Sequence, residues 1–144
     1  MGMNHAGEID YLARIAQPAP RTVVDLGCGA GNVTRLLAQR WPDADIVGVD
    51  NSPEMLAKAR GAAAEAAITH VEFIQGEVED LPFDDGSFDV VISNGVIDLI
   101  PDKDAVFSGI FRVLRPGGRI QFADVTIQVP VSEEGRRNID LWTG

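Results

Sequence analysis

The feature that most constrains this chain is an apolar run ending in alternating glycines, VVDLGCGAG at residues 23–31. Two β-branched residues lead into an acid, glycine then recurs at every second position, and a helical pattern begins at Asn32. A buried strand that ends in glycines and opens a helix can bring bare backbone close to a bound molecule. The alternative interpretation is a glycine-rich turn that holds no ligand.

The spacing of these glycines departs from the dinucleotide-binding fingerprint. That fingerprint places its third glycine three residues after the second. In this sequence Asn32 occupies that position and the glycine is Gly31, so the fingerprint fails by one residue. The spacing therefore argues against a nicotinamide dinucleotide as the ligand.

Length and charge limit the chain to one domain and to few kinds of partner. With 144 residues, 45% of them hydrophobic, we expect a single domain over residues 1–144 with one core. Acidic residues outnumber basic ones 22 to 12, and the formal charge is −10. Because such a chain repels phosphate backbones, we expect no nucleic-acid partner, although this charge can also serve solubility alone.

Cysteine content and apolar runs exclude further classes of protein. The only cysteine, Cys28, cannot form an internal disulfide, and no His/Cys cluster has zinc spacing, so we expect no metal site. Residues 1–15 lack a basic region followed by an apolar run, and no apolar stretch approaches the ~20 residues that span a bilayer. We therefore expect a cytoplasmic protein without a membrane partner.

Short β-branched runs alternate with helical patterns along the chain. The expected strands are residues 22–26, 45–49, 70–74, 88–93 and 118–125. The expected helices are residues 6–16, 33–41, 53–67, 102–114 and 132–142. Pro116-Gly117-Gly118 is expected to stop the fourth of these helices and to turn the chain into the last strand.

This alternation predicts an α/β fold, a doubly wound and mostly parallel sheet with right-handed crossovers. Ligands of such sheets bind beyond the carboxyl ends of the strands, at the point where strand order reverses. Asp50 ends the second expected strand, where a carboxylate can accept hydrogen bonds from both hydroxyls of a ribose. The alternative for Asp50 is a solvated turn residue.

Several motifs in order resemble class I S-adenosylmethionine (SAM) dependent methyltransferases over residues 20–127. They are D-x-G-x-G-x-G in the glycine loop, Asp50, Leu-Pro-Phe at 81–83, Phe-Asp at 88–89 and Pro-Gly-Gly at 116–118. The resemblance implies a Rossmann-like core with SAM as cofactor. It also implies that the loop lies against the amino-acid end of the cofactor through Asp25, Gly27, Cys28, Gly29 and Gly31.

The same resemblance implies contacts with the rest of the cofactor. Asn51 lies beside the ribose, and Met55 packs on the adenine, although Met55 could equally be ordinary helix core. Glu77 stands where the family has aspartate and accepts from the adenine amino group, while the Val78 N–H donates to a ring nitrogen.

Three further acidic or amide residues keep alternatives open. Glu79 and Asp80 compete with Glu77, or together form a solvated acidic turn. Asn94 is a candidate contact for the methionine part of SAM, or simply the end of its strand.

The second half of the chain, residues 93–125, is similar to arsenite methyltransferases and their relatives. Trivalent arsenic needs thiolate ligands, and this chain carries Gly95 where those enzymes have a cysteine. Since Cys28 is the only thiol, we expect no arsenic methylation.

We therefore predict a SAM-dependent methyltransferase for a small-molecule acceptor. Its catalytic residues are not evident, since in-line methyl transfer can proceed by positioning alone. The family adds a helix and two strands after the fifth strand, and we expect a shortened core without those last two strands. The alternatives are a SAM-binding domain without turnover and, third, an NAD-binding protein.

The edge of the fifth strand leads us to expect a homodimer. An edge without a neighbouring strand tends to pair with another chain, either directly or by exchange of C-terminal tails. A monomer whose own tail covers the edge is the alternative.

Overall fold

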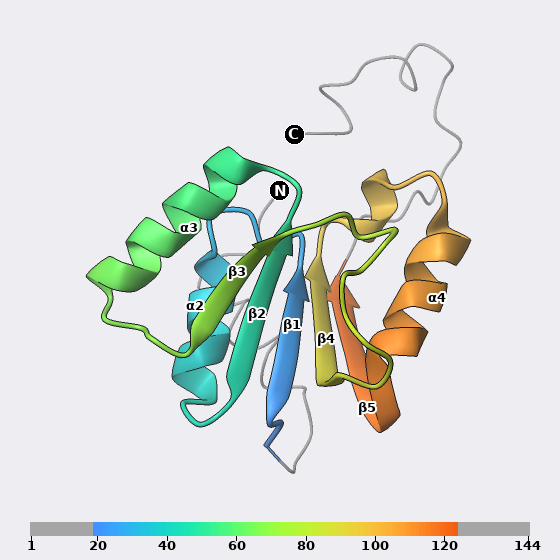
Figure 1. The fold of residues 1–144 in the computed structure, drawn as a ribbon, viewed down its shortest axis with the longest axis horizontal. Coiled ribbons are helices and arrows are strands. Elements are labelled where there is room, and N and C mark those ends of the chain that lie inside the picture. Colours follow the sequence, from blue (N-terminus) through green and yellow to red (C-terminus); the bar gives the residue numbers. More distant parts are fainter. Residues whose placement is uncertain (1–18, 124–144) are drawn as a thin grey trace.

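Five parallel strands form one sheet in the order β3-β2-β1-β4-β5 (Figure 1). The structure is a computed structural model that describes residues 19–123. The strands are β1 Thr22–Leu26, β2 Asp45–Asp50, β3 Val71–Gln75, β4 Phe88–Asn94 and β5 Leu114–Ala123. The chain builds outward from β1 to β3 and then returns to place β4 on the other side of β1, so strand order reverses between β1 and β4. The predicted doubly wound parallel fold is confirmed.

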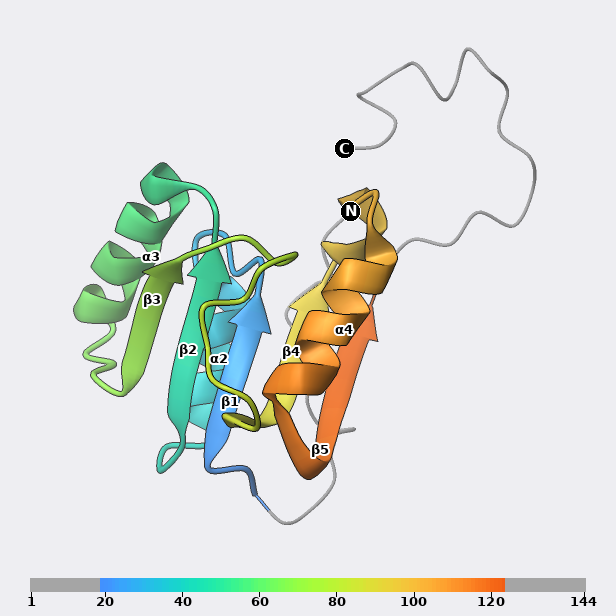
Figure 2. The same cartoon turned by 45° about the vertical axis from the view of Figure 1, so that its right-hand side comes forward.

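Helices cover both faces of this sheet (Figure 2). The helices α2 (Asn32–Arg40) and α3 (Pro53–Glu65) lie on one face. The other face carries α4 (Lys103–Val113), which follows the short 3-10 helix η1 (Ile97–Leu99). Neighbouring residues of β1 therefore point into different clusters, Val23 toward α2 and Val24 toward α4, as the period of a strand requires.

The predicted helix starts are confirmed by their caps. The Ser52 hydroxyl accepts a hydrogen bond from the Met55 N–H at 3.2 Å, and Pro53 occupies the first turn of α3. The Asp102 carboxylate accepts from the Ala105 N–H at 3.0 Å and begins α4. Both helices thus begin where short polar side chains satisfy free backbone donors.

The predicted start of the last strand was wrong. The helix ends at Val113, and β5 begins at Leu114, four residues before the expected start at Gly118. Leu114 pairs with Phe88 and Arg119 with Val90, so the Pro-Gly-Gly segment bulges inside the strand instead of preceding it. The proline disfavours helical backbone at Arg115, and the core contact of Leu114 is made from the strand.

Other predictions fall outside the described residues. They are the helices expected at 6–16 and 132–142 and the part of the fifth strand beyond 123. Among residues 19–123, no helix has the length and apolar character needed to cross a bilayer.

Candidate functional site

Two cavities open at the carboxyl ends of the strands, beside the point where strand order reverses. The larger, of about 340 Å³, lies between the loops that follow β1, β2, β3 and β4. The smaller, of about 190 Å³, lies between the glycine loop, the start of α2 and the end of β4. Gly27 lines both cavities. An elongated ligand could therefore occupy both by passing Gly27.

Most of the predicted site residues line one of these cavities. In the larger cavity the predicted residues are Gly27, Asp50, Asn51, Glu77 and Val78, with the competing candidate Glu79. In the smaller cavity they are Asp25, Gly27, Cys28 and Asn94. The structure thus brings together residues from the ends of four strands.

Other lining residues were missed by the sequence analysis. They are Gly76, Val96, Leu99, Ile100 and Pro101 in the larger cavity, and Ala30, Asn32 and Val33 in the smaller. The larger cavity has an apolar wall formed by Val96, Leu99, Ile100 and Pro101. The sequence carries no signal for this wall, because its apolar residues also suit a buried segment.

Asp50 holds the glycine loop in place as well as lining the larger cavity. One carboxylate oxygen accepts a hydrogen bond from the Gly29 N–H, and the other accepts from the Ser52 N–H, both at 2.9 Å. The Cys28 N–H also donates to the Val49 carbonyl at 2.9 Å. The loop after β1 is thereby fastened to the end of β2 and to the start of α3.

Asp25 is a buried carboxyl group with one strong partner. Its side chain accepts a hydrogen bond from the Thr34 hydroxyl at 2.7 Å, and the residue is 2% exposed. Burial raises the pKa of Asp25 to about 7; the Thr34 hydrogen bond opposes this rise and the charge of Asp50 adds to it. The Asp25 carboxyl group therefore titrates near neutral pH. Sequence reasoning missed Thr34.

The glycines of the loop are required for different reasons. Gly27 has φ +67°, and a β-carbon there would overlap a methyl carbon of Val96. At Gly31, with φ +81°, a β-carbon would lie 3.1 Å from the Ala59 β-carbon and from the Phe73 ring. At these two positions the backbone thus lies close to other side chains of the protein, which leave little room for a β-carbon.

Gly29, Gly31 and Met55 are predicted site residues that line neither cavity. A β-carbon at Gly29 would meet only the Met55 methyl group, at an ordinary 3.6 Å, so the described protein atoms leave room for it. The constraint on Gly29 is its φ of +53°, which favours glycine.

Cys28 is buried and holds its proton. Burial, followed by the charges of Asp25 and Asp50, raises the pKa of the Cys28 thiol to about 12. Since the thiolate is the reactive form, Cys28 does not serve as a nucleophile at neutral pH. No group of three or more His, Cys, Asp or Glu side chains within residues 19–123 is placed to hold a metal ion.

The charge of the site has one sign. Asp50, Glu77 and Glu79 line the larger cavity and Asp25 the smaller, and none of the described lining residues is lysine or arginine. The pair of cavities therefore favours a ligand with positive charge over one with phosphate groups.

Residues 20–141 match a family described as a methyltransferase domain. The chain belongs to this methyltransferase domain family. The resemblance predicted from the glycine loop, Asp50 and the later motifs is confirmed.

Individual relatives extend this result. The chain is 46% identical over 124 residues to an arsenite methyltransferase of Halobacterium salinarum, covering 85% of this chain and 32% of that protein. It is 42% identical over 109 residues to a trans-aconitate 2-methyltransferase of Azoarcus sp., covering 76% and 41%. The chain therefore spans less than half the length of these relatives.

A solved structure agrees with both fold and family. The S-adenosylmethionine dependent methyltransferase of Mesorhizobium loti matches with a TM-score of 0.69 at 28% identity, over 79% of this chain and 51% of that one. The family and its structural neighbours thus imply the use of SAM.

Proposed function

We propose that this chain is the cofactor-binding core of a SAM-dependent methyltransferase that acts on a small-molecule acceptor. The observation that carries the proposal is the pair of acidic cavities that meet at Gly27 beside the reversal of strand order. SAM bears a sulfonium and an ammonium group, whereas NAD bears a pyrophosphate. A site lined by carboxylates, with no lysine or arginine among its described lining residues, attracts the cationic groups of SAM and repels the pyrophosphate of NAD.

The residues of the larger cavity fit the adenosine part of SAM. Asp50 and Asn51 would hold the ribose, and Glu77 with the Val78 N–H would hold the adenine. Each carboxylate oxygen of Asp50 accepts one backbone N–H and keeps a second lone pair for a ribose hydroxyl. Val78 is buried and lines this cavity.

The residues of the smaller cavity fit the amino-acid part. Asp25, the Cys28 backbone and Asn94 would surround it. Gly29 and Gly31 would act through the shape of the loop, and Met55, placed against Gly29, would support that loop more than the adenine.

The bound cofactor would supply an electrophilic methyl group on sulfur. The chain's own part would be to orient the two reactants and to exclude water, since in-line displacement gains most from alignment. The apolar wall of Val96, Leu99 and Pro101 is the surface we assign to the acceptor; Leu99 is 54% exposed. We name no catalytic base.

Arsenite is not the acceptor that we propose. Gly95 adopts φ +73° at an exposed position, and Cys28 is the only cysteine of the sequence. A thiolate site for arsenic would need thiols that this chain does not carry.

Assembly and location are further parts of the proposal. Three phenylalanines leave an exposed apolar surface on α4 and β5: Phe111 is 84% exposed, Phe107 41% and Phe122 47%. This surface supports a homodimer that forms through the β5 edge. A monomer is the alternative, and light scattering distinguishes the two by their molar mass in solution. A single domain over residues 1–144, a cytoplasmic location and the lack of a nucleic-acid partner remain predictions.

Calorimetry and thermal melting test the choice of cofactor. SAM or S-adenosylhomocysteine should raise the melting temperature by mass action, and NAD should not. Protection by NAD with no effect of either adenosyl ligand would overturn the proposal. Binding without release of S-adenosylhomocysteine in the presence of small acceptors would favour the SAM-binding domain without turnover.

A further inference from the structure

The amino ends of β1, β4 and β5 enclose another open cavity, of about 340 Å³, at the pole of the sheet opposite the proposed cofactor site. Its lining includes three arginines, Arg21, Arg115 and Arg119, and one carboxylate, Asp89. The SAM-binding proposal gives this cavity no role.

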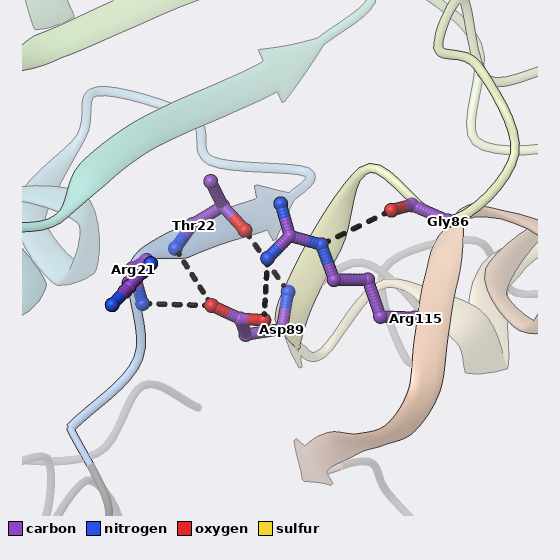
Figure 3. A network of polar contacts seen from close by, with 5 residues as sticks. All are labelled: Arg21, Thr22, Gly86, Asp89 and Arg115. Carbon is purple, nitrogen blue, oxygen red and sulfur yellow. Dashed lines mark hydrogen bonds and ion pairs between the residues drawn. The ribbon is translucent and has the colours of Figure 1, made fainter.

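Asp89 anchors the wall of this cavity through a network of hydrogen bonds (Figure 3). One carboxylate oxygen accepts from the Arg21 N–H at 2.8 Å and from the Thr22 N–H at 3.2 Å. The other accepts from the Arg115 guanidinium at 3.2 Å, and the Arg115 Nε–H donates to the Gly86 carbonyl at 3.2 Å. Both carboxylate oxygens thereby accept hydrogen bonds, and Arg115 is held between Asp89 and Gly86.

The charge of Asp89 persists across the neutral range. Burial raises its pKa, but the two backbone N–H groups and Arg115 outweigh burial and lower the pKa below its ordinary value. This one negative charge balances one of the three guanidinium groups in the cavity.

The guanidinium groups of Arg21 and Arg119 form no ion pair with any carboxylate of the described residues. Within residues 19–123, the side chains of Arg21 and Arg119 make no hydrogen bond or ion pair, and both residues are exposed. An anion bound in this cavity would therefore meet guanidinium groups that no described carboxylate neutralises.

We propose that this cavity binds a small oxyanion of the phosphate class, held between Arg21, Arg115 and Arg119. A guanidinium group suits phosphate because two of its N–H donors can bond two phosphate oxygens in a bidentate arrangement. A long polyanion is disfavoured, since the chain carries a formal charge of −10 around this one basic cavity. The shared chemistry is the phosphoryl group, either as free phosphate or on a small phosphorylated metabolite.

Thermal melting in sodium phosphate, against sodium chloride at the same ionic strength, tests the site. Phosphate should raise the melting temperature with a saturable dependence. R119Q and R21Q should each weaken the apparent phosphate affinity by about tenfold or more, the range for a hydrogen bond to a charged group. R40Q is the matched control, because Arg40 is an exposed arginine at the end of α2 outside the cavity.

Glycerol phosphate, tested in parallel, distinguishes the source of the phosphoryl group. Saturation by inorganic phosphate supports a free anion, and saturation by glycerol phosphate alone supports a phosphorylated metabolite. Equal melting in phosphate and chloride with no response to glycerol phosphate, or equal effects of R119Q and R40Q, would overturn the site. The melting shift with SAM should be the same in R119Q as in the parent chain, so this proposal and the proposed function fail separately.

Discussion

At each end of the sheet, which we call the carboxyl pole and the amino pole, an aspartate accepts two backbone N–H groups, but the charges around the two aspartates differ. At the carboxyl pole Asp50 accepts two backbone N–H groups, from Gly29 and Ser52. At the amino pole Asp89 also accepts two, from Arg21 and Thr22. Each aspartate therefore fastens a neighbouring segment to the end of a strand.

What differs is the charge that faces each aspartate. Asp89 has the guanidinium of Arg115 beside it, whereas none of the ion pairs of residues 19–123 involves Asp50. An aspartate already neutralised by the protein has a structural role, and one left without a basic partner is available to a ligand. The comparison predicts that changes at the carboxyl pole alter SAM binding and that equivalent changes at the amino pole leave SAM binding unchanged.

The largest expected effect is that of Gly27→Ala. Its β-carbon would enter the Val96 side chain, and φ of +67° adds left-handed strain, so we expect a loss of about 2–5 kcal/mol of stability and no measurable SAM binding. Gly86→Ala is the control, because Gly86 has φ +64° with nothing within 4 Å of a β-carbon. Denaturant titration and calorimetry measure both. Equal losses in the two variants would mean that strain alone explains Gly27.

The next effect is that of Asp50→Ala against Asp89→Ala. Each leaves two backbone donors without their acceptor, so each should cost about 1–3 kcal/mol of stability. Only Asp50→Ala should also cost about 1.5–3 kcal/mol of SAM affinity, the range for hydrogen bonds to a charged group. Calorimetry on the folded variants decides it. Equal SAM affinities would remove Asp50 from the cofactor site and end the distinction between the poles.

The sequence predicts most of the fold because its signals are local. Strand β1 lies where its β-branched run predicts it. The helices α3 and α4 begin directly after their predicted N-caps, Ser52 and Asp102, because caps act over a few residues. The start of β5 was mispredicted because it depends on pairing of Leu114 with Phe88, which are distant in sequence.

The candidate site divides in the same way. Asp50, Glu77 and Asn94 could be placed at the carboxyl edge because each lies at the end of a recognisable strand or just after it. The sequence could not predict that Gly27 lies close to Val96 or that Gly31 lies close to Phe73, because both contacts depend on packing between distant segments.

An effect that depends on pH, spread over about three pH units, concerns Asp25. Its pKa rises from an ordinary 3.8 to about 7, so the folded chain binds this proton more tightly than the unfolded chain does. The free energy of unfolding should therefore fall as pH rises from about 4 to about 7, by about 1 kcal/mol per pH unit near pH 6. Urea titrations of the parent chain and Asp25→Asn at several pH values measure this fall. The variant should lose it, and parallel curves would contradict a raised pKa at Asp25.

The smallest expected effect is that of neutralising one exposed charge at each pole. Glu79 lines the larger cavity at an exposed position and would act on a cationic cofactor through charge alone. Glu79→Gln should therefore weaken SAM binding by only about two- to fivefold at low salt. The difference should vanish at about 0.5 M salt, where the Debye length is only a few ångströms.

Arg119→Gln is the matched change at the amino pole and should leave SAM affinity unchanged at either salt concentration. Calorimetry of both variants at low and high salt completes the comparison. A loss of affinity in Glu79→Gln that persists at high salt would mean that Glu79 makes a direct contact and competes with Glu77 for the adenine. An equal loss in Arg119→Gln would show that the two poles are coupled, and the charge of the larger cavity would then no longer explain its preference for a cation.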